Sequence, residues 1–246
     1  EMGLLTLQFS QNLLKERKAF ELHITDEAQM DGLPATAREA AALTAKKRGK
    51  EGFVFTLDQP SYSPFLTYST QRDLRQKMFM AYNTLCTHAN SENNLDICKR
   101  IINLRREVAQ LLGYETYADF VLEHRMASNI YNVYQLLDSL IDAYKPTALK
   151  EQEELKATAK KLEGDDFELM PWDMAFYSHK LKLERYNIDA EMLRPYLQLD
   201  KVIDGVFRLA NTLYGISFKE NKDIPTYHPD VKAYEVFDKD GAYLAV

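Results

Sequence analysis

The 246-residue sequence has little glycine or proline and almost no cysteine or tryptophan, with nine, eight, two and one residues respectively. Nine glycines leave few positions for phosphate-cradling loops, and the sequence contains neither a Walker loop nor a Gly-x-Gly-x-x-Gly run. Two cysteines, Cys86 and Cys98, argue against a disulfide framework. Both fall on apolar faces of expected helices, so we predict two buried free thiols.

Long apolar runs and concentrated positive charge are also missing. No apolar stretch approaches the ~20 residues that a membrane helix needs, so no membrane partner is expected. The formal net charge is -6 at pH 7 and the pI is about 5.5. Because phosphate binding needs clustered Lys and Arg, this balance argues against a nucleic-acid partner. The short basic runs at 46–48 and 99–100 are typical of solvated helix surface.

Motifs for self-contained catalysis are absent as well. No histidine begins a His-Glu-x-x-His run, the spacing that places two imidazoles on one helix face. There is no Gly-x-Ser-x-Gly elbow, and neither cysteine has a recognisable catalytic context. Carboxylate pairs such as Glu153-Glu154 and Asp165-Asp166 lie on charged helical segments, where solvated surface is the favoured interpretation. We therefore expect no metal site and no catalytic residue within residues 1–246.

What the sequence does contain is helical periodicity. Apolar residues recur at spacings of three and four, for example Ile97, Ile101, Leu104 and Val108 in a helix that Gly113 should end. The same pattern predicts helices through most of the chain. Their expected ranges are 3–20, 35–48, 70–89, 94–112, 116–126, 132–164, 172–186 and 202–214.

Strand signals are few and short. The β-rich segment 52–57 predicts one strand, and a hairpin is predicted over 231–246 because Gly241 supplies the positive φ of its turn. The segment 60–65 carries two prolines, which argues against regular structure there. The predicted fold is therefore mainly α, a multi-helix body with a few short strands. No linker or repeat interrupts it, so residues 1–246 are expected to form a single piece without an internal boundary.

Aromatic residues gather at 172–177, beside the only tryptophan. On a helix, Trp172 and Phe176 share one face, and Asp173 and Tyr177 share the next. Composition and spacing alone favour a core anchor, with Asp173 placed favourably near a positive helix N-terminus. A functional role is the second interpretation.

Five stretches of the chain, in this order, carry a family resemblance. They are 19–22 with 26–27 and 32–34; 55–57 with 60–65 and 72–77; 104–107 with 111–113; 172–177 with 186–189 and 193–196; and 228–231 with 234–236. Each stretch alone is weak, but five in register are specific. They resemble the thimet-oligopeptidase-like zinc metallopeptidases, the family of oligopeptidase A and peptidyl-dipeptidase. Two departures are conservative: Phe176 stands where the family usually has a tyrosine, and Tyr227 where a tryptophan often precedes the histidine.

The resemblance implies a zinc-dependent parent protein that hydrolyses short peptides. In that family two histidines of His-Glu-x-x-His and a downstream glutamate bind Zn²⁺, and the glutamate of the motif activates the bound water. None of these residues occurs in 1–246, so we expect them beyond Val246, and the long N-terminal helices of the family upstream of Glu1. The chain then resembles an internal piece that forms part of the substrate-channel wall. It is expected to be inactive alone, to hold no zinc, and to need the remaining catalytic region of the same polypeptide, to which the hairpin 231–246 should belong.

The resemblance also nominates channel residues, for each of which a structural role is at least as good an interpretation as substrate contact. They are Trp172, Asp173, Tyr177 and His228, with Tyr62 and Arg72 behind them. A non-enzymatic helical scaffold or interaction domain is the alternative function. The expected location is the cytoplasm, with the periplasm as the alternative.

Overall fold

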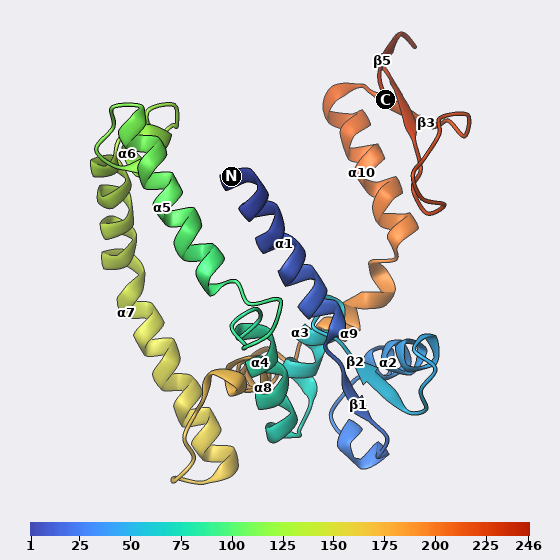
Figure 1. Ribbon diagram of the computed structural model, residues 1–246. Coiled ribbons are helices and arrows are strands. Elements are labelled where there is room, and N and C mark those ends of the chain that lie inside the picture. The colour runs from blue at the N-terminus through green and yellow to red at the C-terminus, as the bar shows by residue number, and fades with distance from the viewer. The chain divides into compact units, whose positions relative to one another are not determined.

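The computed structural model describes all residues from 1 to 246, which form two compact units, 1–187 and 188–246 (Figure 1). The fold is mainly α-helical with two small antiparallel sheets, which confirms the predicted class. No helix has both the length and the apolar character that crossing a membrane would require. The expectation of a single piece without an internal boundary stays a prediction.

The main core of the first unit surrounds a two-stranded sheet. Strand β1 (Leu22–Ile24) pairs antiparallel with β2 (Phe53–Phe55), and helix α2 (Ala35–Lys47) covers β2 with a face of small alanines. The short 3₁₀ helix η1 (Glu27–Met30), α3 (Gln59–Tyr68) and α4 (Arg72–Asn83) complete this core. Its most deeply buried apolar side chains include Leu57, Phe65 and Met78, which are fully enclosed.

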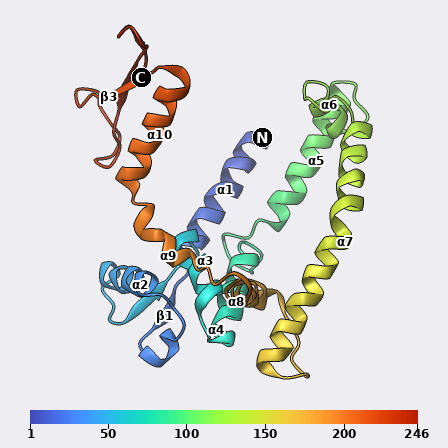
Figure 2. The same cartoon turned by 180° about the vertical axis from the view of Figure 1, so that it is seen from behind.

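Long helices extend from this core. Helix α1 (Met2–Ala19) packs against α5 (Leu95–Leu111), the helix predicted over 94–112. Helix α6 (Tyr117–Leu122) lies between α5 and α7 (Ile130–Glu163) in the chain and contacts both, as both views show (Figures 1 and 2). The first half of α7 buries no side chain, whereas its second half packs on α8 (Met174–Tyr186) through a smaller core of Leu155, Ala159, Phe176 and Tyr177.

The second unit combines a helix with a three-stranded sheet. The turns α9 (Ala190–Leu193) and η3 (Arg194–Tyr196) lead into α10 (Leu199–Tyr214). Strands β3 (Ser217–Glu220), β4 (Tyr234–Phe237) and β5 (Tyr243–Ala245) follow in the order β3-β4-β5, all antiparallel. The β4–β5 pair, with Gly241 at a φ of 81°, confirms the predicted hairpin.

The prediction of irregular structure at 60–65 is wrong, because these residues lie in helix α3. Pro60 occupies the first turn, where a backbone N–H has no partner within the helix in any case. Pro64 lies further along and removes one internal hydrogen bond. Burial of Tyr62, Phe65 and Leu66 on the same helix outweighs that loss.

The prediction of two buried thiols on helices is only partly confirmed. Cys86 is buried, but it lies in a turn after α4 with a φ of 58°, not on a helix. Cys98 is exposed on α5, so its predicted burial is wrong. The apolar stripe of α5 faces inward at Ile101 and Leu104, and position 98 lies outside it.

Candidate functional site

The structure brings two of the nominated residues, Arg72 and Asp173, into direct contact. Arg72 opens α4, and Asp173 ends the single-turn 3₁₀ helix η2 (Pro171–Asp173) that precedes α8. Pro171 suits this first turn because its missing N–H would have no helical partner there. The carboxylate of Asp173 turns back and accepts a hydrogen bond from the backbone N–H of Met170, at 3.1 Å. A local backbone contact thus helps to orient the carboxylate.

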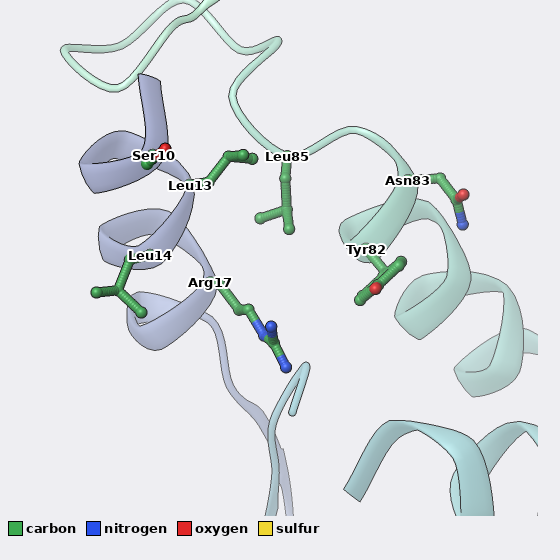
Figure 3. Close-up of a pocket in the computed structure, with 7 residues that line it drawn as sticks. All are labelled: Ser10, Leu13, Leu14, Arg17, Tyr82, Asn83 and Leu85. Carbon is green, nitrogen blue, oxygen red and sulfur yellow. The ribbon is translucent and has the colours of Figure 1, made fainter. Parts of the chain in front are cut away.

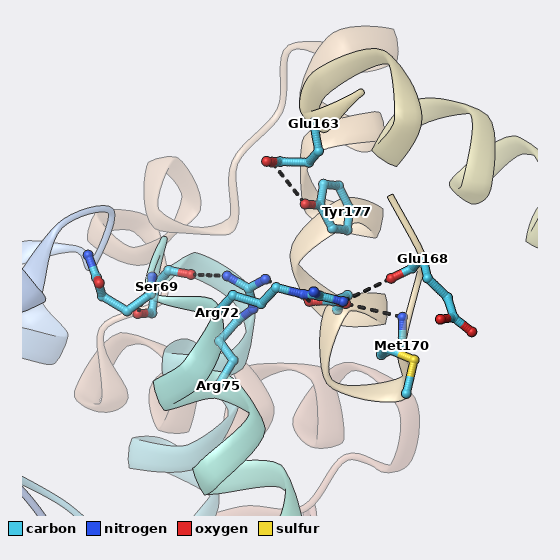
Figure 4. Close-up of polar contacts among 9 residues, drawn as sticks. Ser69, Arg72, Arg75, Glu163, Glu168, Met170 and Tyr177 are labelled. Atoms are coloured by element: carbon cyan, nitrogen blue, oxygen red, sulfur yellow. Dashed lines mark hydrogen bonds and ion pairs between the residues drawn. The ribbon is translucent and has the colours of Figure 1, made fainter. Parts of the chain in front are cut away.

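Asp173 is fully buried and is held by two arginines of α4. Nη2 of Arg72 lies 2.8 Å from Oδ2, and Nε of Arg72 lies 3.2 and 3.1 Å from the two carboxylate oxygens. Nη2 of Arg75 donates to Oδ1 at 2.8 Å. Figure 4 shows the Arg72 guanidinium reaching from α4 toward Glu168, and the Arg75 guanidinium beside the carbonyl of Ser69. We call Arg72, Arg75 and Asp173 the buried ion cluster.

Arg75 is the more enclosed of the two arginines of the cluster, with a side chain only 2% exposed. Its Nη1 donates to the carbonyl of Ser69 at 2.8 Å, and its guanidinium lies over the ring of Phe176, 4.3 Å from the centroid. Its Nε has no hydrogen-bond partner. A buried guanidinium without its carboxylate would be costly, so Arg75 depends on Asp173.

Arg72 differs from Arg75 because its side chain is 42% exposed. Nη2 also donates to the carbonyl of Glu168 at 2.8 Å, and the guanidinium covers the ring of Phe167 at 4.5 Å. Arg72 therefore connects the segment before η2 to α4 while keeping one edge at the surface.

The electrostatics of the cluster favour its charged form. Burial acts to raise the pKa of Asp173, but the hydrogen bonds from Arg72 and Arg75 outweigh it and hold that pKa below its ordinary value. The hydrogen bond from Arg72 to Asp173 likewise raises the pKa of the Arg72 guanidinium. Asp173 is thus ionised near neutral pH, and its oxygens are occupied by donors.

Tyr177 lies one helical turn after Asp173 on α8 and is 1% exposed. Its hydroxyl donates to Oε1 of Glu163, the last residue of α7, at 2.9 Å. Burial, followed by this bond to Glu163, raises the pKa of the Tyr177 phenol well above its ordinary value. The phenol stays protonated near neutral pH and links the end of α7 to α8 (Figure 4).

The other nominated residues lie in different surroundings. Trp172 is half-buried beside Asp173, with its ring centroid 6.3 Å from that of Phe79. Tyr62 belongs to the main core, where its ring stacks on Tyr82 at 4.5 Å. His228 belongs to the second unit and is 60% exposed, with Nδ1 3.7 Å from a carboxylate oxygen of Asp230.

The contacts of the buried ion cluster and Tyr177 hold helices in place. The oxygens of Asp173 are occupied by hydrogen-bond donors, and the hydroxyl of Tyr177 donates to Glu163. The arrangement fixes α4, η2 and α8 as one rigid element of the first unit.

A hollow of about 460 Å³ lies between α1 and α4, away from this cluster (Figure 3). Arg17 of α1 reaches into it opposite Tyr82, and Nη2 of Arg17 lies 3.3 Å from Asp58. Apolar side chains of Leu13, Leu14 and Leu85 line most of it. Its lining contains no histidine, cysteine or carboxylate.

The residues present do not fit a zinc site. No group of three or more histidine, cysteine, aspartate or glutamate side chains is arranged to hold a metal ion anywhere in residues 1–246. Tetrahedral zinc needs three or four such ligands, so no catalytic step through a metal can be derived from this chain.

Sequence reasoning missed Arg75, Glu163 and the carbonyl partners Ser69 and Glu168. Arg75 leaves one signal in the sequence: it lies three positions before the apolar Met78, a spacing that places both on one helix face. The spacing does not show that Arg75 is buried, but a fully buried arginine needs a paired charge. Glu163 leaves no comparable signal, since it follows a run of charged residues at the end of α7.

Comparison with known proteins gives one family and a consistent set of relatives. The sequence model of peptidase family M3 matches residues 65–245. The chain is 40% identical to oligopeptidase A of Escherichia coli (strain K12) over 236 residues, which cover 94% of this chain and 35% of that protein. It is 33% identical to dipeptidyl carboxypeptidase of the same organism over 248 residues, covering 100% of this chain and 36% of that protein.

A plant relative matches a similar share of this chain, and a similar share of its own length is matched. The chain is 35% identical over 254 residues to an organellar oligopeptidase A, chloroplastic/mitochondrial, of Arabidopsis thaliana, covering 100% of this chain and 32% of that protein. The chain therefore spans about a third of the length of the curated relatives it matches.

Proposed function

The chain belongs to peptidase family M3, and on that premise we propose that the whole protein is a zinc-dependent peptidase that hydrolyses short peptides. The observation that carries the proposal is the family match across residues 65–245, which includes the buried ion cluster and most of the second unit. Relatives named oligopeptidase A and dipeptidyl carboxypeptidase support a peptide substrate.

Within that protein, residues 1–246 supply part of the wall of the substrate channel. The support is geometric: Asp173 fixes α4 against η2, and the neighbouring Trp172 and Arg72 keep part of their side chains at the surface. Such a surface, held rigid from behind by buried charges, suits contact with an extended peptide. Tyr177 and Tyr62 support the wall from the core, and His228 is the candidate contact in the second unit.

Zinc belongs to the whole protein in this proposal, and its ligands lie outside residues 1–246. The chain alone then neither binds zinc tightly nor cleaves peptides. Its partner in catalysis is the remaining region of the same polypeptide, which would carry the His-Glu-x-x-His helix and continue from the hairpin of β4 and β5. The cytoplasm is the proposed location.

A peptidase assay on the whole gene product tests the proposal. A quenched fluorogenic peptide of about ten residues should be cleaved and a folded protein should not, because a channel lined by helices admits extended chains only. A chelator should abolish cleavage and added zinc should restore it. Activity that survives the chelator, or no activity with zinc present, would contradict the proposal and favour the alternative of a non-enzymatic helical scaffold.

The channel-wall role has its own test in the whole protein. Trp172→Ala should raise KM for peptides more than it lowers kcat, since Trp172 would contact substrate and not the reacting atoms. Met174→Ala on the adjacent, outward position of α8 is the matched control and should leave both constants unchanged. Equal effects of the two substitutions on KM would contradict the role.

A further inference from the structure

Helix α10 of the second unit has two apolar faces, and only one of them has a partner. On the inner face, the ring of Phe207 stacks on Phe218 of β3 at 4.2 Å and meets Tyr234 of β4 edge-on at 5.0 Å. Ile203 and Ala210 lie on the same face and are half-buried. This face accounts for the attachment of α10 to the sheet.

The second face is an uncovered apolar stripe. Its members follow one another at spacings of three and four residues, the period that keeps side chains on one side of a helix. Each is between 40% and 72% exposed. The stripe consists of Leu199, Val202, Val206, Leu209 and Leu213.

Gly205 lies at the edge of this stripe, three residues after Val202 and four before Leu209. Glycine is less favourable than alanine in a helix interior, so a mid-helix glycine needs a reason. The second unit offers none: a Cβ built at Gly205 would meet no atom within 4 Å. The space beside Gly205 allows another backbone to approach the helix closely.

The second unit is also poor in burial. None of its residues, from 188 to 246, is fully buried. A unit of this size normally needs a larger buried apolar surface or a cross-link to be stable alone. The stripe is an unused apolar surface of this unit, so covering it would add burial.

We propose that the α10 stripe is a helix-packing surface. Its occupant is an amphipathic helix from the part of the same polypeptide that lies outside residues 1–246. The inference rests on the proposed function only for the existence of that longer polypeptide. Spacing of three and four residues forms the ridge that a second helix accepts, and Gly205 lets the two backbones approach. Relatives carry about two thirds of their length outside the region matched here, which provides the occupant.

The size of the stripe favours this occupant over a second copy of the chain. Sixteen residues of helix span roughly 24 Å, and one such pair buries less than the ~1,200 Å² typical of stable interfaces. A covalently connected partner does not need that area, because its effective concentration is in the millimolar range.

Hydrogen exchange of the α10 amides in the whole protein and in chain 1–246 tests the inference without using peptidase activity. Exchange in α10 should be at least roughly 100-fold slower in the whole protein, since covering the stripe stabilises the helix. Leu209→Gln in the whole protein should remove most of that protection. Arg208→Gln, at the adjacent residue on the polar face, is the matched control and should leave the protection unchanged.

Gly205→Ala gives a second, independent readout. In chain 1–246 it should slow α10 exchange, because alanine is the better helix former. In the whole protein it should accelerate exchange, because the new methyl group keeps the partner backbone away. Equal α10 exchange in the two proteins, protection that rises with the concentration of 1–246, or slower exchange on Gly205→Ala in both would each overturn the inference. A whole protein without zinc-dependent activity but with a protected α10 would refute the proposed function alone.

Discussion

Nη2 of Arg75 donates a 2.8 Å hydrogen bond to Oδ1 of Asp173 across 98 residues of sequence, and neither side chain is more than 2% exposed. This contact joins α4 to η2 and the start of α8. Arg72 donates to the same carboxylate from the protein surface. A carboxylate shared by a buried and a half-exposed guanidinium gives the first unit its rigid connection behind the proposed channel surface.

Removing the charge of Asp173 should strongly destabilise the first unit. Asp173→Asn leaves Arg75 buried without its counter-charge, and breaking a buried pair in this way costs about 3–5 kcal/mol. Urea unfolding followed by the fluorescence of Trp172, the only tryptophan, measures the loss. The exposed pair Lys99–Asp96 provides the control, and Asp96→Asn should change stability by less than about 0.5 kcal/mol. Similar losses in the two variants would contradict the importance of the buried ion cluster.

Acid should weaken the attachment of α1 through Glu16. Its carboxylate accepts hydrogen bonds from His88, Asn90 and the backbone N–H of Cys86. Burial raises the pKa of Glu16, but these bonds, with His88 the strongest, outweigh burial and lower it. Because the folded pKa is depressed, the contribution is complete above the unfolded value of about 4.3 and is lost as pH falls through the lower folded value.

The measurement for Glu16 is the free energy of unfolding between pH 6 and about pH 3, within the range where carboxylates titrate. The difference between the native chain and Glu16→Gln should be constant above about pH 5 and shrink below about pH 4. Glu115→Gln, at an exposed position on a turn, should show no such change. A difference that persists unchanged into acid would mean that the charge of Glu16 does not contribute.

Local patterns predicted most of the helices and the hairpin, because their causes lie within a few residues. The α5 stripe of Ile101 and Leu104 identifies both the helix and its buried face, and Gly241 identifies the β4–β5 turn. Helix α3 was missed since its two prolines oppose helix locally, and the burial of Phe65 that overrides them comes from β2 and α4. Strand β3 was missed because its pairing partner β4 begins more than ten residues later.

The candidate site was predictable only in part for the same reason. Asp173 and Tyr177 share a helix face by spacing, so their proximity follows from sequence. The pairing of Asp173 with Arg75 does not, because no local rule joins residues 98 positions apart. The family resemblance nominated Arg72, whereas the more buried Arg75 carries the stronger dependence on Asp173.

Two glycines in left-handed conformations should respond very differently to alanine. Gly32 has a φ of +80°, and a Cβ there would lie 2.2 Å from the carbonyl oxygen of Tyr68. Gly49 has a φ of +67° and open space around its Cβ position. Gly49→Ala should cost about 1–2 kcal/mol from backbone strain alone. Gly32→Ala should cost several kcal/mol more than Gly49→Ala, because the backbone of Tyr68 must move. Thermal unfolding of both variants isolates the clash, and equal losses would contradict it.

The two cysteines should differ sharply in their reactivity toward a thiol reagent. Cys86 is 2% exposed, and burial, with the hydrogen bond to Glu16, raises the pKa of its thiol to about 11. At pH 8 roughly a thousandth of it is thiolate, the reactive form, and the reagent must also reach a buried sulfur. Cys98 is exposed on α5 and should react at the rate of a free thiol. With 5,5′-dithiobis-(2-nitrobenzoic acid), the folded chain should therefore release one equivalent quickly and the second at least roughly 100-fold more slowly. Cys98→Ser should remove the fast phase and Cys86→Ser the slow one.

Glu16→Gln should accelerate the slow phase, because Glu16 holds the turn that carries Cys86. An unchanged slow rate would place the barrier in the core around Cys86 and not in that hydrogen bond.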